Sequence, residues 1–298
     1  MEIGYMMEIN KEDGIKKKIQ YMLFNIFTKE KVQRIENKWI VEIRNQEKGK
    51  KIESLDVLLK KYRIETLVLE EKLNKNQEFK NKLYSKGYTI LNGKKFMKYG
   101  IIKILDFISK QMEILVKEQD VSILINDMGR IEEYYIEEIA KIVRSVTIIT
   151  NHTNKFRIVE EKLYDEFGIV LNINNNKRKG LAKAKVIINF DFPEELIKQY
   201  RIARNAVIVN LEQNLAITSK RFEGILINDW KVSFKEERLN DIPKKGAFNP
   251  NYLYESELIQ IPFIAKVEEK MKKDQIEINY LIGKNGKISK QEFELVKK

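Results

Sequence analysis

The sequence contains no cysteine, which excludes disulfides, thiolate nucleophiles and thiolate metal sites. Only 4 of its 298 residues are proline and 13 are glycine, so long flexible linkers and low-complexity segments are not expected. No apolar run approaches the roughly 20 residues that a helix needs to cross a bilayer. A signal peptide has an apolar run behind a basic segment, and the first residues show no such pattern. We therefore expect a cytoplasmic protein. These absences favour a compact chain without structural zinc.

Basic residues are abundant: the formal net charge is +12 and the pI is about 9.4. Such a charge is typical of proteins that bind phosphates, and nucleic acid is therefore one hypothesis for the partner. However, lysine alternates with glutamate along most of the expected helices, which is typical of solvated helix faces. We therefore interpret the basic residues as part of solvated helix faces and not as the lining of a groove that binds a nucleic-acid backbone.

Helical and extended patterns divide the chain into two lobes. Residues 15–27 have apolar side chains at helical spacing and lysines on the other side, which predicts an amphipathic helix. It would either dock on the first domain, which we favour, or lie on an anionic membrane. Strands then alternate with helices up to residue 95, so residues 1–95 form the first, smaller α/β domain. A long helix over residues 96–116 follows, and we assign residues 96–118 as a bridge between the lobes.

The clearest section of the sequence begins at residue 121. Apolar runs of four to six residues alternate with helical segments, as expected of parallel strands covered on both faces. With right-handed crossovers, the fold class is a Rossmann-like, doubly wound α/β sheet of order 3-2-1-4-5, in a domain spanning residues 119–214. Residues 215–298 should pack back on the lobes. The five strands are expected at residues 121–126, 146–150, 169–173, 185–190 and 206–211, with helices at 131–143, 156–167 and 193–200.

Polar residues end each of these strands. In open parallel sheets, ligands bind outside the carboxyl ends of the strands, at the point where the strand order reverses. That point lies between the first and fourth strands. Asn and Asp also cap helices, and we weigh this role equally with ligand binding. The candidate ligand-binding residues here are Asn126, Asp127, Gly129, Asn189 and Asp191.

The loop after the second strand supplies four further candidates, Asn151, His152, Thr153 and Lys155. His152 is the only histidine of the chain and the first candidate for an acid or base at neutral pH. A single loop histidine is more often a surface residue. Thr153 and Lys155 could bind a phosphate, or the loop could simply cap the next helix.

Two further segments, residues 174–179 and 283–292, resemble binding sites. Residues 174–179 (NNNKRK), with Lys183 beyond them, form a dense basic patch. It could hold an anion, but a solvated loop is favoured. Residues 283–292 resemble half of a calcium loop, although Leu281 and Gly283 stand where carboxylate ligands belong. We therefore predict no metal site, and a helix capped at Ser289 instead.

The run from VSILIND through TNHTNKF to KAKVIINFDFPEE and AVIVNL resembles the cofactor-binding half of the shikimate dehydrogenase and glutamyl-tRNA reductase families. Asn151, His152, Thr153 and Lys155 match the polar turn after the second strand, and residues 184–188 match the later Ala-Asp-Val-Ile-Ile-like strand. The resemblance implies NAD(P) binding and an oxidoreductase relative. NADP would be favoured over NAD, since Lys155 and Arg157 follow the second strand and no acidic ribose ligand does.

The turn after the first strand departs from that pattern. A dinucleotide site uses G-x-G-x-x-G, which lets the backbone approach the pyrophosphate, whereas residues 126–130 read NDMGR. One hypothesis is a protein that binds a nucleotide or small anionic ligand in the cleft between the lobes. The second is a non-catalytic binding or regulatory protein with a degenerate cofactor site. The third, which we favour least, is nucleic-acid association through residues 174–185 and the basic helix.

Overall fold

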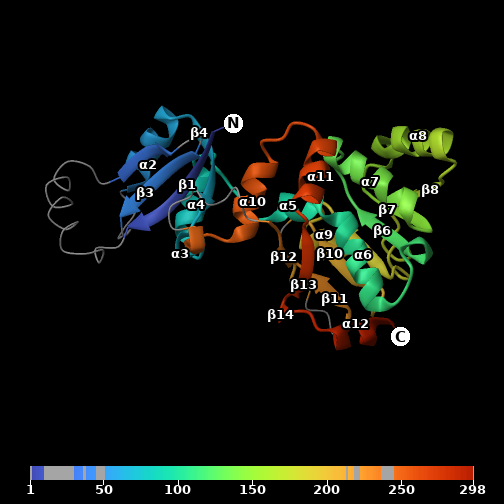
Figure 1. Ribbon diagram of the computed structural model, residues 1–298. Coiled ribbons are helices and arrows are strands. Elements are labelled where there is room, and N and C mark those ends of the chain that lie inside the picture. Colours follow the sequence, from blue (N-terminus) through green and yellow to red (C-terminus); the bar gives the residue numbers. More distant parts are fainter. Residues whose placement is uncertain are drawn as a thin grey trace, which may run out of the picture. The chain divides into compact units, whose positions relative to one another are not determined.

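The computed structural model describes residues 2–9, 30–35, 38–44, 51–212, 214–217, 222–235 and 245–297 (Figure 1). The amphipathic helix expected at residues 15–27 lies outside this part of the chain. Two compact units are present: unit 1 comprises Met1–Phe96 and Lys235–Phe263, and unit 2 comprises Met97–Phe234 and Ile264–Lys298. None of the helices in the described ranges combines the length and apolar character needed to span a membrane.

Unit 1 is built on a five-stranded, mostly parallel sheet of order β2-β3-β1-β4-β5. β1 pairs in parallel with β3 and β4, and β4 with β5, whereas β2 forms an antiparallel hairpin with β3. The smaller α/β domain is therefore confirmed as a class, but its central strand and its hairpin strand were not predicted. The strands are β1 (Glu2–Ile9), β2 (Glu30–Ile35), β3 (Lys38–Arg44), β4 (Ile64–Leu69) and β5 (Thr89–Ile90).

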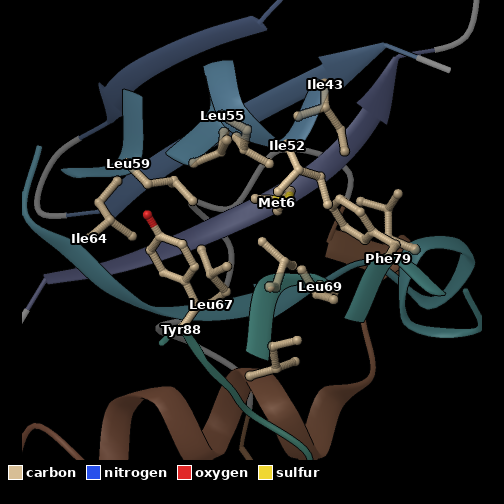
Figure 2. Close-up of a cluster of buried hydrophobic side chains, with 14 residues drawn as sticks. Met6, Ile43, Ile52, Leu55, Leu59, Ile64, Leu67, Leu69, Phe79 and Tyr88 are labelled. Carbon is tan, nitrogen blue, oxygen red and sulfur yellow. The ribbon is translucent and has the colours of Figure 1, made fainter. Parts of the chain in front are cut away.

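Helices α2 (Lys51–Lys61), α3 (Glu71–Asn74) and α4 (Gln77–Ser85) contribute apolar side chains to the core of this unit. Figure 2 shows Leu55 and Leu59 of α2 and Phe79 of α4 beside the strand residues Met6 and Leu67. All five are at most 3% exposed, so their burial drives the packing of the helices on the sheet.

The last part of unit 1 comes from a distant stretch of chain. Helix α10 (Pro250–Leu258), which follows the short η3 (Lys245–Ala247), returns to the loop after β5. The carboxylate of Glu255 is buried there and accepts the backbone N–H groups of Gly93 and Lys95, each at 2.7 Å, and of Asn92 at 3.1 Å. Burial raises the pKa of Glu255, while the three N–H groups and Lys95 lower it.

Unit 2 contains a six-stranded parallel sheet of order β11-β10-β9-β6-β7-β8. When the six strands are numbered 1 to 6 along the chain and read from β8 to β11, the order is 3-2-1-4-5-6, so β11 is a sixth strand added beside the fifth. The Rossmann-like class is confirmed, and the predicted order is short by one strand. The strands are β6 (Asp120–Leu124), β7 (Ser145–Ile149), β8 (Leu171–Asn174), β9 (Val186–Asn189), β10 (Val207–Asn210) and β11 (Ile225–Ile227).

The crossover helices of unit 2 follow the predicted pattern. They are α7 (Arg130–Ile142), α8 (Arg157–Phe167), entered through η2 (Thr153–Phe156), and α9 (Glu194–Ile197). α8 ends at Gly168, whose φ of +66° is the left-handed conformation that glycine adopts without a Cβ clash. α9 is only half the length of the predicted helix at residues 193–200.

The single helix predicted for residues 96–116 is corrected, and the bridging helix at 96–118 with it. The segment is divided into α5 (Lys94–Tyr99), α6 (Ile101–Met112) and the turn η1 (Val116–Glu118). α5 and α6 are separated at Gly100, where a Cβ atom would lie 1.9 Å from Cη2 of Trp230. Trp230 is fully buried, so its ring fills the space that a side chain at this position would need.

The C-terminal third is shared between the units. Unit 2 receives α11 (Ile264–Lys273), α12 (Lys290–Lys297) and an antiparallel sheet of β12 (Asp229–Ser233), β13 (Glu277–Gly283) and β14 (Gly286–Lys287). The Asn228 N–H donates to the Ile282 carbonyl at 2.8 Å, which joins this sheet to the end of β11. The predicted cap of α12 is confirmed, since the Glu292 N–H donates to Ser289 Oγ at 3.3 Å.

Candidate functional site

Asp191 follows β9 and forms the centre of the polar cluster at the carboxyl edge of unit 2. Its carboxylate accepts the Asn126 N–H at 2.8 and 2.9 Å and the Asp127 N–H at 2.7 Å. Burial raises the pKa of Asp191; the two N–H groups and Lys98 lower it, and the charge of Asp127 raises it. The N–H groups of Asn126 and Asp127 are thus satisfied by a carboxylate of the same chain.

The loops after β6 and β7 are held together by two further contacts. The Asn126 side-chain oxygen accepts the Asn151 N–H at 2.9 Å. Asp127 forms an ion pair with Lys155 at 2.6 Å, with side chains 82% and 51% exposed, and the Lys155 ammonium lowers the pKa of Asp127. The exposed carboxylate of Asp127 is therefore bound to Lys155 of the neighbouring loop.

Gly129 is the N-cap residue of α7, and Glu132 connects it to Lys98, a residue that the sequence did not indicate as part of the site. Its N–H donates to Oε2 of Glu132 at 3.2 Å, and Oε1 of Glu132 pairs with Lys98 at 2.7 Å. Lys98 also lies over the Phe190 ring, 5.7 Å from its centroid. The Gly-x-x-Glu spacing of a helix cap could have identified Glu132, but no local pattern pointed to Lys98.

Asn189, another predicted ligand contact, is fully buried. Its Nδ2 donates to the Phe192 carbonyl at 2.9 Å and to Asn210 Oδ1 at 2.6 Å, and its Oδ1 accepts the Phe192 N–H at 2.8 Å. These bonds fix the turn that carries Asp191 and join β9 to β10. Buried amides satisfied in this way serve primarily to position their neighbours.

His152 and Thr153 lie in the turn before α8. His152 is exposed; its N–H donates to Thr150 Oγ1 at 3.0 Å and its carbonyl accepts the Lys155 N–H at 2.9 Å. Thr153 is half-buried at the start of η2. The described contacts thus join the loop after β7 to the loop after β6 through Asn151 and Lys155, and Asp191 after β9 binds the same β6 loop. Asn189 is buried at the end of β9.

The basic segment after β8 is organised as a turn. Asn176 Oδ1 accepts the N–H groups of Arg178 and Lys179, and the Lys177 ammonium donates to Gln199. Its cationic side chains are exposed rather than gathered around a groove. Nowhere in the described ranges do three or more His, Asp or Glu side chains approach one another closely enough to hold a metal ion.

The NAD(P) implied by the family resemblance can be tested against this geometry. A dinucleotide needs free N–H groups in the turn after the first strand, because these hold its pyrophosphate. Those of Asn126 and Asp127 are bound to Asp191, and that of Gly129 to Glu132. These three N–H groups are therefore not available to a pyrophosphate in this arrangement.

No protein-family model and no curated protein matches the chain. D-mandelate dehydrogenase from Rhodotorula graminis is a similar solved structure, with a TM-score of 0.39 and 7% identity over 86% of this chain and 91% of that chain. Shikimate 5-dehydrogenase from Listeria monocytogenes has a TM-score of 0.28 and 8% identity over 70% and 78%. Aspartate transcarbamoylase from Trypanosoma cruzi has a TM-score of 0.30 and 11% identity over 74% and 75%. At these scores none of them assigns an activity, and the Rossmann-like class rests on the strand order.

Proposed function

We propose that the chain is a non-catalytic, Rossmann-like binding protein whose site has no place for a dinucleotide cofactor. The observation that carries this proposal is the bonding of Asp191 to the backbone N–H groups of Asn126 and Asp127. A carboxylate of the chain takes the position that a phosphate of the cofactor would need.

The energetics favour the internal carboxylate over an external phosphate. Charge-assisted bonds from N–H to carboxylate contribute about 1.5 to 3 kcal/mol each, and they form here without the entropy cost of association. A pyrophosphate would have to displace Asp191 and approach its negative charge.

The groups left for a ligand lie beyond this internal pair. Asn151, His152 and Lys155 are exposed on the loop after β7 and offer an amide, an imidazole and an ammonium group. Together they suit a small polar or anionic molecule that is held by side chains rather than by a backbone cradle. This is the ligand class we assign to the carboxyl edge of unit 2.

NADP is the second candidate, and the exposed pair of Lys155 with Asp127 favours it. Exposed ion pairs contribute little to stability in water, so a ribose 2′-phosphate could recruit Lys155 at little cost. The difference between the candidates is whether Asp191 leaves the turn when the nucleotide arrives.

Calorimetric titration of the wild-type chain and of Asp191→Ala separates them. We expect no heat of binding from NADPH or NADH with the wild-type chain at millimolar concentration. Asp191→Ala frees two backbone N–H groups, so we expect it to gain binding of inorganic phosphate that depends on ionic strength.

Asp191→Asn is the matched control, since its side-chain oxygen can still accept one N–H while the charge is removed. It should gain less phosphate binding than Asp191→Ala. Micromolar binding of NADPH to the wild-type chain would contradict the proposal and support the second candidate.

A further inference from the structure

The two edge strands of the six-stranded sheet of unit 2, β11 and β8, differ in what lies beside them. At one end, β11 leads into Asn228, whose N–H donates to Ile282 in the adjoining antiparallel sheet. At the other end, β8 is hydrogen-bonded to β7 and to no other strand of the described chain. We call the free side of β8, with Val170 before it and the charged residues on either side, the β8 edge.

β8 lacks some of the features that usually prevent strands from pairing between molecules, although at four residues it is short. β8 reads LNIN and contains no proline and no charged residue, and its Ile173 is only half-buried. Val170, immediately before the strand, is 72% exposed, and Tyr164 in the last turns of α8 is 62% exposed. Apolar side chains thus flank a row of backbone groups that can accept another strand.

Charges on the β8 edge are separated along the strand direction. Asp165 and Glu166 precede β8 at the end of α8, and Arg178 and Lys179 follow it. All four side chains are exposed, and none of them forms an ion pair within the described ranges. One end of the edge is therefore acidic and the other basic.

We propose that the β8 edge pairs with the β8 edge of a second copy of this chain, antiparallel about a twofold axis between Asn172 and Ile173. A twofold axis reverses the strand direction, so the acidic end of each copy meets the basic end of the other. The two six-stranded sheets then form one continuous sheet.

The arrangement of charges favours this occupant over a strand from another protein. An edge with one acidic and one basic end is complementary to itself only when the two copies run in opposite directions; parallel pairing would bring like charges together. Val170 of one copy then lies close to Asn175 of the other, so its exposed side chain loses contact with water at the interface.

Sedimentation velocity of the full chain over a range of concentrations tests the proposal, and we expect a reversible dimer. Reversing the basic end with Arg178→Glu and Lys179→Glu, or the acidic end with Asp165→Lys and Glu166→Lys, should weaken the dimer about tenfold or more. Combining all four changes in one chain should restore it, because each new acidic end then faces a new basic end.

Lys272→Glu with Lys273→Glu is the matched control, since it makes the same change of net charge on exposed residues of α11. It should leave the dimer unchanged. Asn172→Lys places two like charges at the axis and should give a monomer with unchanged circular dichroism. A wild-type chain that stays monomeric at all concentrations, or a fourfold variant that does not recover, overturns the proposal.

Discussion

Asp191 and Glu255 occupy equivalent environments in the two units. Each carboxylate binds backbone N–H groups of a loop that follows a parallel strand, and burial is the main cause of a raised pKa in both. Such a loop in other Rossmann-like folds is available to a ligand phosphate. Here each loop is held by a negative charge that belongs to the chain itself.

The raised pKa of Asp191 predicts how the stability of unit 2 changes with pH. Between its ordinary pKa of 3.8 and its raised pKa in the folded protein, Asp191 is deprotonated in the unfolded chain and still protonated in the folded one. The corresponding stabilisation is complete below that pH and is lost as the pH rises through the folded pKa. We expect Asp191→Asn to remove this part of the decline in the free energy of unfolding, measured by urea titration at a series of pH values.

Glu161→Gln, at an exposed position of α8 outside the β8 edge, is the control for the pH series and should leave the slope unchanged. An unchanged slope in Asp191→Asn would show that the carboxylate of Asp191 is already ionised throughout the series, contrary to its burial.

At the scale of elements, Gly100 determines where one helix ends and the next begins. The apolar period continues through α5 and α6, so the sequence pattern alone predicts a single helix. Trp230, 130 positions away, fills the space beside the backbone at this point. Helix interruptions with such a tertiary cause cannot be read from a local window of sequence.

Gly100→Ala should destabilise unit 2 by about 1 to 3 kcal/mol or more, since the new methyl group would overlap the Trp230 ring. Urea unfolding followed by tryptophan fluorescence measures the change, in a Trp39→Phe background so that Trp230 is the emitting residue. Gly246→Ala, where a Cβ atom meets nothing within 4 Å, is the control and should be nearly neutral. Equal stability of the two variants would contradict the assigned role of Trp230.

At the scale of the whole molecule, unit 1 is assembled from two separate parts of the chain. Leu253 and Leu258 of α10 are fully buried, and Glu255 holds the loop after β5. The first 96 residues alone therefore lack part of their core and an acceptor for three N–H groups.

We expect a fragment of residues 1–96 to be partly folded and to gain structure when a peptide of residues 245–263 is added. Amide hydrogen exchange of the Asn92, Gly93 and Lys95 N–H groups should slow on addition, because Glu255 accepts all three. A peptide with Glu255→Ala is the control and should protect them less. Full protection in the fragment alone would show that α10 is dispensable for unit 1.

Apolar runs made the strands of unit 2 predictable, because four to six consecutive buried residues such as those of β9 and β10 leave a local signal. β1 was missed: Gly4 stands in its middle, where it fits closely against Ile64, and glycine is disfavoured in strands. The polar edge was predicted at the residue level. The bond of Asp191 to a loop 65 residues earlier was not, because partners so far apart leave no periodic pattern.

The split origin of unit 1 also sets an order of events during synthesis. A ribosome delivers residues in sequence at about 5 to 20 per second, so most of unit 2 emerges before α10 does. Until then, the nascent sheet of unit 1 lacks α10, whose Ser256 hydroxyl is hydrogen-bonded to the buried Tyr5 of β1 at 2.9 Å. The N-terminal part of unit 1 therefore cannot complete its contacts until α10 has been synthesised.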